Sequence, residues 1–271
     1  MAIITLTTDF GTKDYFTAAL KGAILKEYSE ATLVDISHEV GAYDIEEAAY
    51  LLGNAYPSFP KSTIHIIGVN ATIMPQDRFL VVEARNQFFI AADNGIFSIL
   101  FHNIRVDAIH EIEIPPIEDK PTFPEHDLFV RAAAHLARGG KPGLLGRAID
   151  QYHTVGTERP SYQNNVLKGR VIYIDRFGNV VTNITRKIFD EVRDDRNFTI
   201  VVNQIGRIEI KKISPVYIES KKNASAGKEV AIFNSSGHLE IAMLFGGLDS
   251  GGGAASLLGL KKNMDITIQF E

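Results

Sequence analysis

The sequence contains no cysteine, no long apolar run and no cluster of basic residues. Without cysteine the chain has no disulfide framework, no thiolate nucleophile and no cysteine-ligated metal. No segment approaches the roughly 18 apolar residues that cross a membrane, and no basic segment precedes the apolar stretch 1–6, so we expect a cytoplasmic protein without a signal peptide. The formal net charge of −5 argues against nucleic acid as a partner.

What is present is typical of a globular protein: 271 residues, of which 45% are hydrophobic and 23% charged. Segments with strand-like and helix-like patterns alternate through the first half. The helix-like segments are 15–28, 42–56 and 126–140, and buried strands are predicted at 2–6, 31–37 and 62–69, with a strand pair at 78–84 and 87–92. This order predicts an α/β domain over residues 1–155, with a mostly parallel sheet flanked by helices.

The pattern of hydrophobic and polar residues changes after this domain. Residues 156–166 are polar and aperiodic, which indicates a linker. Short strand patterns separated by turn residues then fill 167–271, and they predict a smaller, all-β, barrel-like domain. The glycine-rich segment 246–256 lacks G-x-G-x-x-G spacing, which favours a flexible loop over a phosphate cradle.

The first strand ends in a carboxylate, in the stretch TTDFG. Ligands of open α/β sheets bind beyond the carboxyl ends of the strands, and Asp9 there could accept hydrogen bonds from a ribose diol, with Phe10 offering apolar surface nearby. Alternatively, Asp9 caps the helix that follows. His38 is close in sequence to two acidic residues, but no second histidine lies at ligand spacing, so no metal site is expected.

Two turns in the second half carry similar alternatives. In IDRFGNVVTNI (174–184), Phe177 could stack on a heterocycle and Asn179 could bind its polar edge, or the residues simply form a hairpin turn. In FNSSGHLEIA, Ser235 and Ser236 are either ligand hydroxyls or turn formers.

Taken together and in order, several segments resemble the S-adenosylmethionine hydroxide adenosyltransferases, relatives of the fluorinases and chlorinases. These segments are LTTDFGTKDYFTAALKGAI, LVDISHEV, DIEEAAYLL, FFIAADNGIFS, VIYIDRFGNVVTNI, NSSGHLEIA and ASLLGLK. The resemblance implies a homotrimer that binds S-adenosylmethionine between the N-terminal domain of one subunit and the C-terminal domain of the next. It implies displacement of methionine at the ribose C5′, with S-adenosylmethionine as substrate and no separate cofactor.

The same resemblance implies a set of substrate-binding residues. Asp9 would hold the ribose diol, Tyr217 would stack on adenine, and the two serines would face the methionine portion. The full set is Asp9, Phe10, Asp175, Phe177, Asn179, Tyr217, Ser235 and Ser236.

The sequence departs from the family where water is handled. The hydrolases use an aspartate, an arginine and a histidine, whereas here Asn70 stands at the aspartate position and Pro124 at the histidine position. Asp77 replaces the first of two arginines, and Arg78 remains. The candidate catalytic residues are therefore Asn70, Arg78 and His126, and an amide cannot act as a base at neutral pH.

Three functions stay open on this basis. The first is a hydrolase with a rebuilt water site, in which Arg78 and His126, or Glu125, replace the missing groups. The second is an adenosyl-binding protein without turnover, and the third is the same displacement with another nucleophile or adenosyl substrate. A structural protein without a ligand would leave Asp9 without a purpose.

Overall fold

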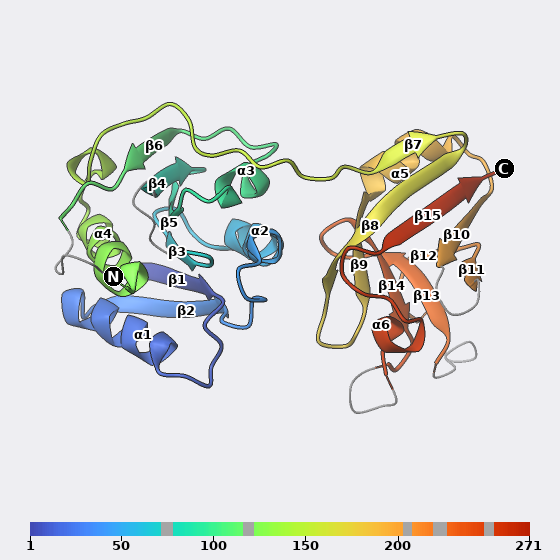
Figure 1. Cartoon of the computed structure of the whole chain (residues 1–271), viewed down its shortest axis with the longest axis horizontal. Helices are drawn as coiled ribbons and strands as arrows, with labels where there is room; N and C mark the ends of the chain where they lie inside the picture. The colour runs from blue at the N-terminus through green and yellow to red at the C-terminus, as the bar shows by residue number, and fades with distance from the viewer. Residues whose placement is uncertain (72–77, 116–121, 203–207, 219–226, 247–251) are drawn as a thin grey trace. The chain divides into compact units, whose positions relative to one another are not determined.

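The computed structural model describes residues 1–71, 78–115, 122–202, 208–218, 227–246 and 252–271. The chain divides into two compact units, Met1–Thr157 and Glu158–Glu271. Each has its own sheet and its own core (Figure 1). In the part of the chain that is described, no helix is long and apolar enough to span a bilayer.

The first unit contains a mixed sheet with the strand order β2-β1-β3-β5-β4-β6. Strands β2, β1, β3 and β5 run parallel, and β4 pairs antiparallel with β5 and β6. The bounds are β1 Ala2–Thr8, β2 Ala31–Ser37, β3 Ile64–Gly68, β4 Phe79–Ala84, β5 Gln87–Ala92 and β6 Ala108–Glu111. The predicted mostly parallel α/β sheet is confirmed.

Helices cover both faces of this sheet (Figure 1). Helices α1 and α4 pack on one face through residues such as Leu20, and α2 and α3 pack on the other through residues such as Leu52. The bounds are α1 Phe16–Glu27, α2 Ile45–Ala55, α3 Ile96–Leu100 and α4 Val130–Ala137, with short 3₁₀ turns at Tyr56–Ser58 and Pro142–Leu144 and a π-helical turn at Glu125–Phe129. Asp44 caps α2 by accepting a hydrogen bond from the Glu47 amide at 3.0 Å.

The second unit is a strongly curved sheet with the order β11-β10-β15-β8-β9-β14-β13-β12. Strand β8 joins both halves, and β11 at one end lies near β13 at the other, which gives the predicted barrel-like form. The bounds are β7 Ser161–Gln163, β8 Val166–Ile174, β9 Val180–Thr185, β10 Phe198–Val202, β11 Ile208–Ile210, β12 Ile213–Ser214, β13 Glu229–Phe233, β14 His238–Met243, β15 Asp265–Phe270, α5 Arg186–Arg193 and α6 Ala254–Leu257.

The segment 156–166 differs from the expected linker. Its last part forms β7, which pairs antiparallel with the start of β8. Three residues of polar sequence were too short a signal for a strand, because β7 is fully exposed at the edge and carries no apolar alternation.

Candidate functional site

Asp9 lies at the carboxyl end of β1, where the neighbouring parallel strands also end. The Asp9 amide donates to the Gly68 carbonyl at 3.4 Å, so the ends of β1 and β3 are joined there. Asp9 does not cap α1, because the helix begins at Phe16 and Tyr15 stands at its N-cap. The position therefore agrees with a ligand-facing carboxylate at the functional edge of the sheet.

Backbone amides hold one oxygen of the Asp9 carboxylate. Oδ2 accepts hydrogen bonds from the Tyr43 amide at 2.9 Å and the Asn70 amide at 3.4 Å. Asn70 has a left-handed backbone (φ 49°), and its carbonyl accepts from the side chain of Asn94 at 3.0 Å. No hydrogen bond to Oδ1 of Asp9 is found among the described residues. The carboxylate is thus oriented with one oxygen still available.

Phe10 turns its ring toward the interior of the first unit. The ring packs against Phe16 at 6.0 Å and Phe123 at 5.4 Å between centroids. It is half-buried and contacts the apolar cluster beneath the sheet. Phe10 therefore packs against the core next to Asp9 and does not present an exposed ring for stacking.

The π-helical turn brings a buried acid to the same place. Glu125 is 4% exposed. A Cβ atom at Gly68 would lie 2.9 Å from Cγ and 3.2 Å from Oε1 of Glu125, so the carboxyl group rests directly on the end of β3. Burial raises the pKa of Glu125 to about 7; a hydrogen bond to its own backbone acts against this rise, and the negative charge of Asp9 adds to it.

The three predicted catalytic residues are placed differently. Asn70 contacts Asp9 through its backbone amide. His126 is exposed and stacks on Phe123 at 5.5 Å, so it lies on the outer side of the turn whose inner side carries Glu125. Arg78 forms an ion pair with Asp93 at the end of β5, and the side chain of Asp93 is shielded from solvent. Asp77 lies outside the described residues.

His38 is buried and contacts side chains on both neighbouring strands. Its Nδ1 lies 2.7 Å from the Thr8 hydroxyl, and its Nε2 lies 3.1 Å from Oδ1 of Asp35, which in turn pairs with Lys21 at 2.6 Å. These contacts connect β1 with β2 close to Asp9. Among the described residues, no group of three or more histidine, aspartate or glutamate side chains is arranged to hold a metal ion.

In the second unit, Asp175 organises the turn between β8 and β9. Its Oδ1 accepts from the amides of Phe177 and Asn179, each at 2.8 Å, and its Oδ2 accepts from Nδ2 of Asn179 at 2.9 Å. Both carboxylate oxygens are therefore used within the turn, as the hairpin interpretation requires. The consequence is a fixed Phe177 that is 62% exposed.

Two glycines lock this turn against the start of α6. Gly178 has φ +74°, and a Cβ there would lie 2.9 Å from Cα of Gly253. A Cβ on Gly253 would lie 2.2 Å from the Phe177 carbonyl oxygen. The described end of the glycine-rich segment thus serves close backbone packing, and the part at 247–251 lies outside the described residues.

A second polar network supports the NSSG turn. The Tyr217 hydroxyl donates to Oε1 of the buried Glu240 at 2.6 Å, and Nδ2 of Asn234 donates to Oε2 at 3.1 Å. Oδ1 of Asn234 accepts from the hydroxyl of Ser236 at 2.7 Å. Ser235 is exposed at the tip. The sequence analysis did not identify Glu240 or Asn234. Glu240 contacts Tyr217, which is 23 residues away in the sequence, and Asn234 belongs to a turn whose sequence has no distinctive pattern.

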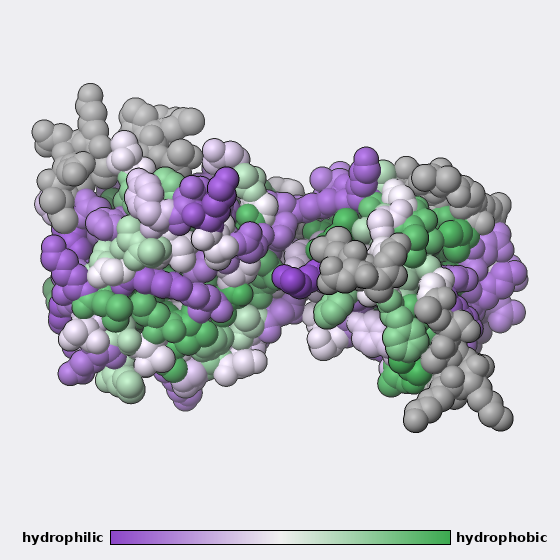
Figure 2. Space-filling model, turned by 90° about the horizontal axis from the view of Figure 1, so that it is seen from below, coloured by the Kyte–Doolittle hydropathy of each residue, from purple (hydrophilic) through white to green (hydrophobic). Residues whose placement is uncertain are grey.

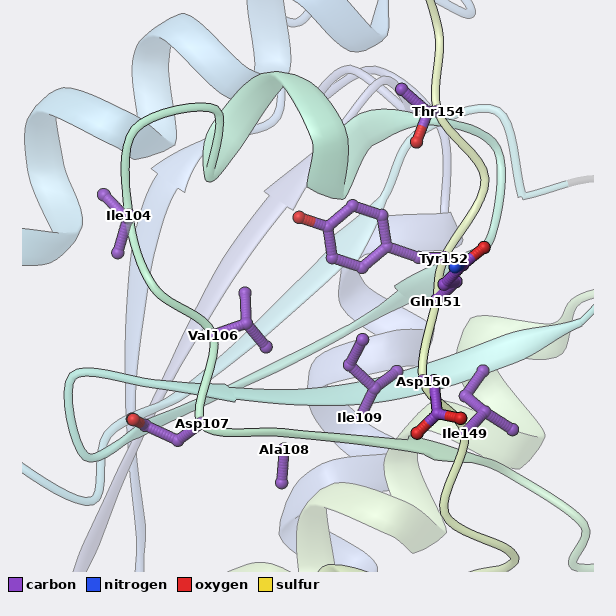
Figure 3. A pocket seen from close by; sticks show the side chains of 10 residues that line it. All are labelled: Ile104, Val106, Asp107, Ala108, Ile109, Ile149, Asp150, Gln151, Tyr152 and Thr154. Atoms are coloured by element: carbon purple, nitrogen blue, oxygen red, sulfur yellow. The ribbon is translucent and has the colours of Figure 1, made fainter.

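Cavities occur away from Asp9. One of about 440 Å³ in the first unit follows β6 and the segment after residue 148, with the Tyr152 ring directed into it (Figure 3). Its lining consists of Ile104, Val106, Asp107, Ala108, Ile109, Ile149, Asp150, Gln151, Tyr152 and Thr154. Another, of about 340 Å³, lies in the second unit and includes Tyr217.

Residues 4–146 match the SAM hydroxide adenosyltransferase N-terminal domain, and residues 169–267 match the SAM hydroxide adenosyltransferase C-terminal domain. A relative named (R)-S-adenosyl-L-methionine hydrolase, from Methanocaldococcus jannaschii, is 32% identical over 89% of this chain and 88% of its own. A relative named fluorinase, from an Actinoplanes species, is 24% identical over 89% of this chain and 90% of its own.

A solved structure shows the same architecture. The crystal structure of an uncharacterized conserved protein from Thermotoga maritima superposes with a TM-score of 0.84 at 28% identity, and the match covers 98% of this chain and 99% of that one. Both domains of the family are therefore matched, in order, along the chain. The chain belongs to the SAM hydroxide adenosyltransferase family of enzymes.

Proposed function

We propose that this protein binds S-adenosylmethionine and replaces methionine at the ribose C5′ with a hydroxyl group from water, which gives adenosine and methionine. Family membership and the relatives named (R)-S-adenosyl-L-methionine hydrolase support this reaction. The observation that carries the proposal is the oriented Asp9 carboxylate, with Oδ2 held by two amides and Oδ1 available.

The ribose diol is the ligand that suits this carboxylate. Its two adjacent hydroxyls are donors, and an ionised carboxylate is an acceptor only, so the pair is complementary. Because Oδ2 is fixed by the amides of Tyr43 and Asn70, the carboxylate is oriented before substrate arrives. We propose that Asp9 fixes the ribose and Phe10 supports it from below.

The second unit supplies groups suited to the base and the amino-acid portion. We propose that Phe177 and Tyr217 stack on adenine, that Asn179 binds its polar edge and that Ser235 and Ser236 face the methionine portion. Phe177 is exposed and Tyr217 is 43% exposed, so both rings are accessible on the second unit. Asp175 then acts by positioning, since its oxygens are used in the turn.

We propose a homotrimer as the assembly that brings the two sets of residues to one substrate. Exposed apolar side chains support an assembly, and Figure 2 shows hydrophobic residues interspersed on the surface of each unit. On the second unit they are Tyr162, Phe177, Val216, Tyr217, Ile218, Phe245 and Leu257. Light scattering after gel filtration tests the trimer, and a monomeric mass at assay concentration would contradict it.

The leaving group makes modest demands on the protein. Methionine departs as a neutral thioether from a sulfonium, so no acid has to protonate it. Water must lose a proton when it attacks, so a proton acceptor is needed near C5′. Asn70 cannot accept that proton, and Arg78 is paired with Asp93.

The test is to incubate the purified chain with S-adenosylmethionine at neutral pH, with and without chloride or fluoride, and to separate the products by chromatography. Adenosine and methionine in every arm are the expected result. Formation of a 5′-halogenated adenosine would show that halide, and not water, is the nucleophile. Binding by calorimetry without any product would leave an adenosyl-binding protein.

A matched pair of variants tests the ribose assignment. Asp9→Ala should abolish binding of S-adenosylmethionine, whereas Asp14→Ala, which removes an exposed carboxylate five residues further along the same segment, should leave it unchanged. Unchanged affinity in Asp9→Ala would remove the assignment.

A further inference from the structure

We infer that Glu125 accepts the proton of the attacking water and thereby replaces the water-handling groups that this chain lacks. The inference rests on the proposed hydrolysis and identifies the residue that makes it possible. The sequence leaves His126 and Glu125 as alternatives, and the structure favours Glu125, because the backbone turns Glu125 inward and His126 outward.

The local backbone explains why Glu125 faces inward and His126 faces outward. Residues 125–129 form a π-helical turn, which is wider than an α-helical turn and is frequent at functional sites. Pro124 precedes it, and α4 continues from Val130. In this turn Glu125 is buried, whereas His126 is exposed and stacks on Phe123.

The contact with β3 places the Glu125 carboxyl group at the ligand-binding edge. Only a residue without a side chain leaves room for it, because a Cβ at Gly68 would approach Cγ of Glu125 to 2.9 Å. Gly68 is also the residue whose carbonyl receives the Asp9 amide. The Glu125 carboxyl and the ribose-binding carboxylate are therefore neighbours across the end of one strand.

The electrostatic surroundings suit a base. Asp9 is the charged group that acts on the Glu125 carboxyl, and no cation pairs with that carboxyl among the described residues. On the same turn, Asp127 is paired with Arg131 at 2.9 Å, and His126 is exposed. The pKa of about 7 leaves a large ionised fraction at neutral pH and a strong affinity for a proton, which is the compromise that general bases need.

The step balances without a further reactant. The water oxygen forms a bond to C5′ while the C5′–sulfur bond breaks and its electron pair goes to sulfur, which converts the sulfonium to neutral methionine thioether. One water proton passes to the Glu125 carboxylate, and the protonated acid later releases it to solvent. The positive sulfonium favours the ionised form of Glu125 while substrate is bound.

The principal test is Glu125→Gln, which keeps the shape of the side chain and cannot accept a proton. We expect kcat for adenosine release to fall by about 10² to 10⁴-fold, with KM and the calorimetric affinity for S-adenosylmethionine nearly unchanged. The control is Glu83→Gln on β4, because Glu83 pairs with Phe88 near the start of β5, at the opposite edge of the sheet. This control should keep full activity.

The pH profile of the wild-type protein gives a second readout that needs no variant. A base must be deprotonated, so kcat/KM should rise with pH through an apparent pKa of about 7, and this limb should vanish from the residual activity of Glu125→Gln. Glu125→Asp should retain part of kcat together with a limb of the same sign.

The outcomes separate this inference from the proposed function. If the wild-type protein releases adenosine but Glu125→Gln does so within threefold of it, or if the wild-type profile has no such limb, Glu125 is not the acceptor and the hydrolysis stands. If the wild-type protein releases no adenosine, the proposed function and this inference fail together.

Discussion

The burial of Glu125 predicts a pH-dependent stability that a single substitution should remove. The carboxyl group is 4% exposed, and its pKa rises from 4.5 to about 7 in the folded protein. Because one pKa unit corresponds to 1.36 kcal/mol, this rise corresponds to roughly 3 kcal/mol of unfolding free energy. Glutamine at this position is neutral at every pH and carries no such dependence.

The sign follows from proton binding. Between about pH 4.5 and about pH 7 the folded protein holds the Glu125 proton and the unfolded chain has lost it, so stability falls as pH rises. The contribution is complete below the unfolded pKa and is lost as pH rises through the folded pKa. Relative to wild type, Glu125→Gln should therefore gain roughly 3 kcal/mol of stability between about pH 4.5 and about pH 8.

A second buried group opposes this dependence in the wild-type protein. His65 is fully buried, and burial lowers its pKa from 6.5 to about 4, so its stabilising contribution is present above the unfolded pKa and is lost as pH falls through the folded pKa. Its magnitude is also roughly 3 kcal/mol. The two groups offset each other between about pH 4.5 and 6.5, and Glu125→Gln should expose the acid sensitivity due to His65.

The assay is urea unfolding of both proteins at several pH values, followed by circular dichroism because the chain has no tryptophan. The difference in unfolding free energy between the two proteins cancels the contributions of all other titrating groups. A difference that stays constant with pH would refute the reasoning, because it would mean that Glu125 titrates alike in the folded and unfolded states.

Three further predictions concern other positions. Gly253→Ala should destabilise the second unit by about 1–3 kcal/mol in urea unfolding and weaken S-adenosylmethionine binding, because its Cβ would lie 2.2 Å from the Phe177 carbonyl oxygen. Gly22→Ala should raise the unfolding free energy by roughly 0.5–1 kcal/mol, since Gly22 lies within α1 and nothing lies within 4 Å of an added Cβ; a loss of stability would contradict the open space. Tyr217→Phe should cost about 1–3 kcal/mol in urea unfolding through loss of its 2.6 Å hydrogen bond to the buried Glu240, and an unchanged midpoint would deny that bond any net effect.

Local patterns in the sequence were enough to predict the main elements of the fold. Short apolar runs identified the parallel strands, and helix-like patterns identified α1, α2 and α4. Strand β7 escaped because an exposed edge strand of three residues has no apolar face. The pattern method fails there because it detects burial, and β7 has none.

The site was predicted less completely, because its decisive contacts are not local. The position of Asp9 could be predicted from its place at a strand end, but the pairing of Arg78 with Asp93 joins two strands and left no signal in either segment alone. The choice between Glu125 and His126 depends on one extra residue in a π-helical turn. Spacing from a helix start cannot supply that information, since side-chain direction changes by about 100° with each residue.

The departures from the family pattern form one connected arrangement once these contacts are considered. At Asn70, where the resemblance implies an aspartate, the side chain is an amide, and the backbone amide donates to Asp9. Two residues earlier, Gly68 leaves the space that a buried Glu125 occupies from the neighbouring π-helical turn. In the proposed site, the π-helical turn therefore supplies to this edge of the sheet the carboxyl group that Asn70 does not provide. Keeping both neighbouring carboxylates charged would be costly, and the raised pKa of Glu125 relieves that cost; the proposed sulfonium substrate would favour the charged form again.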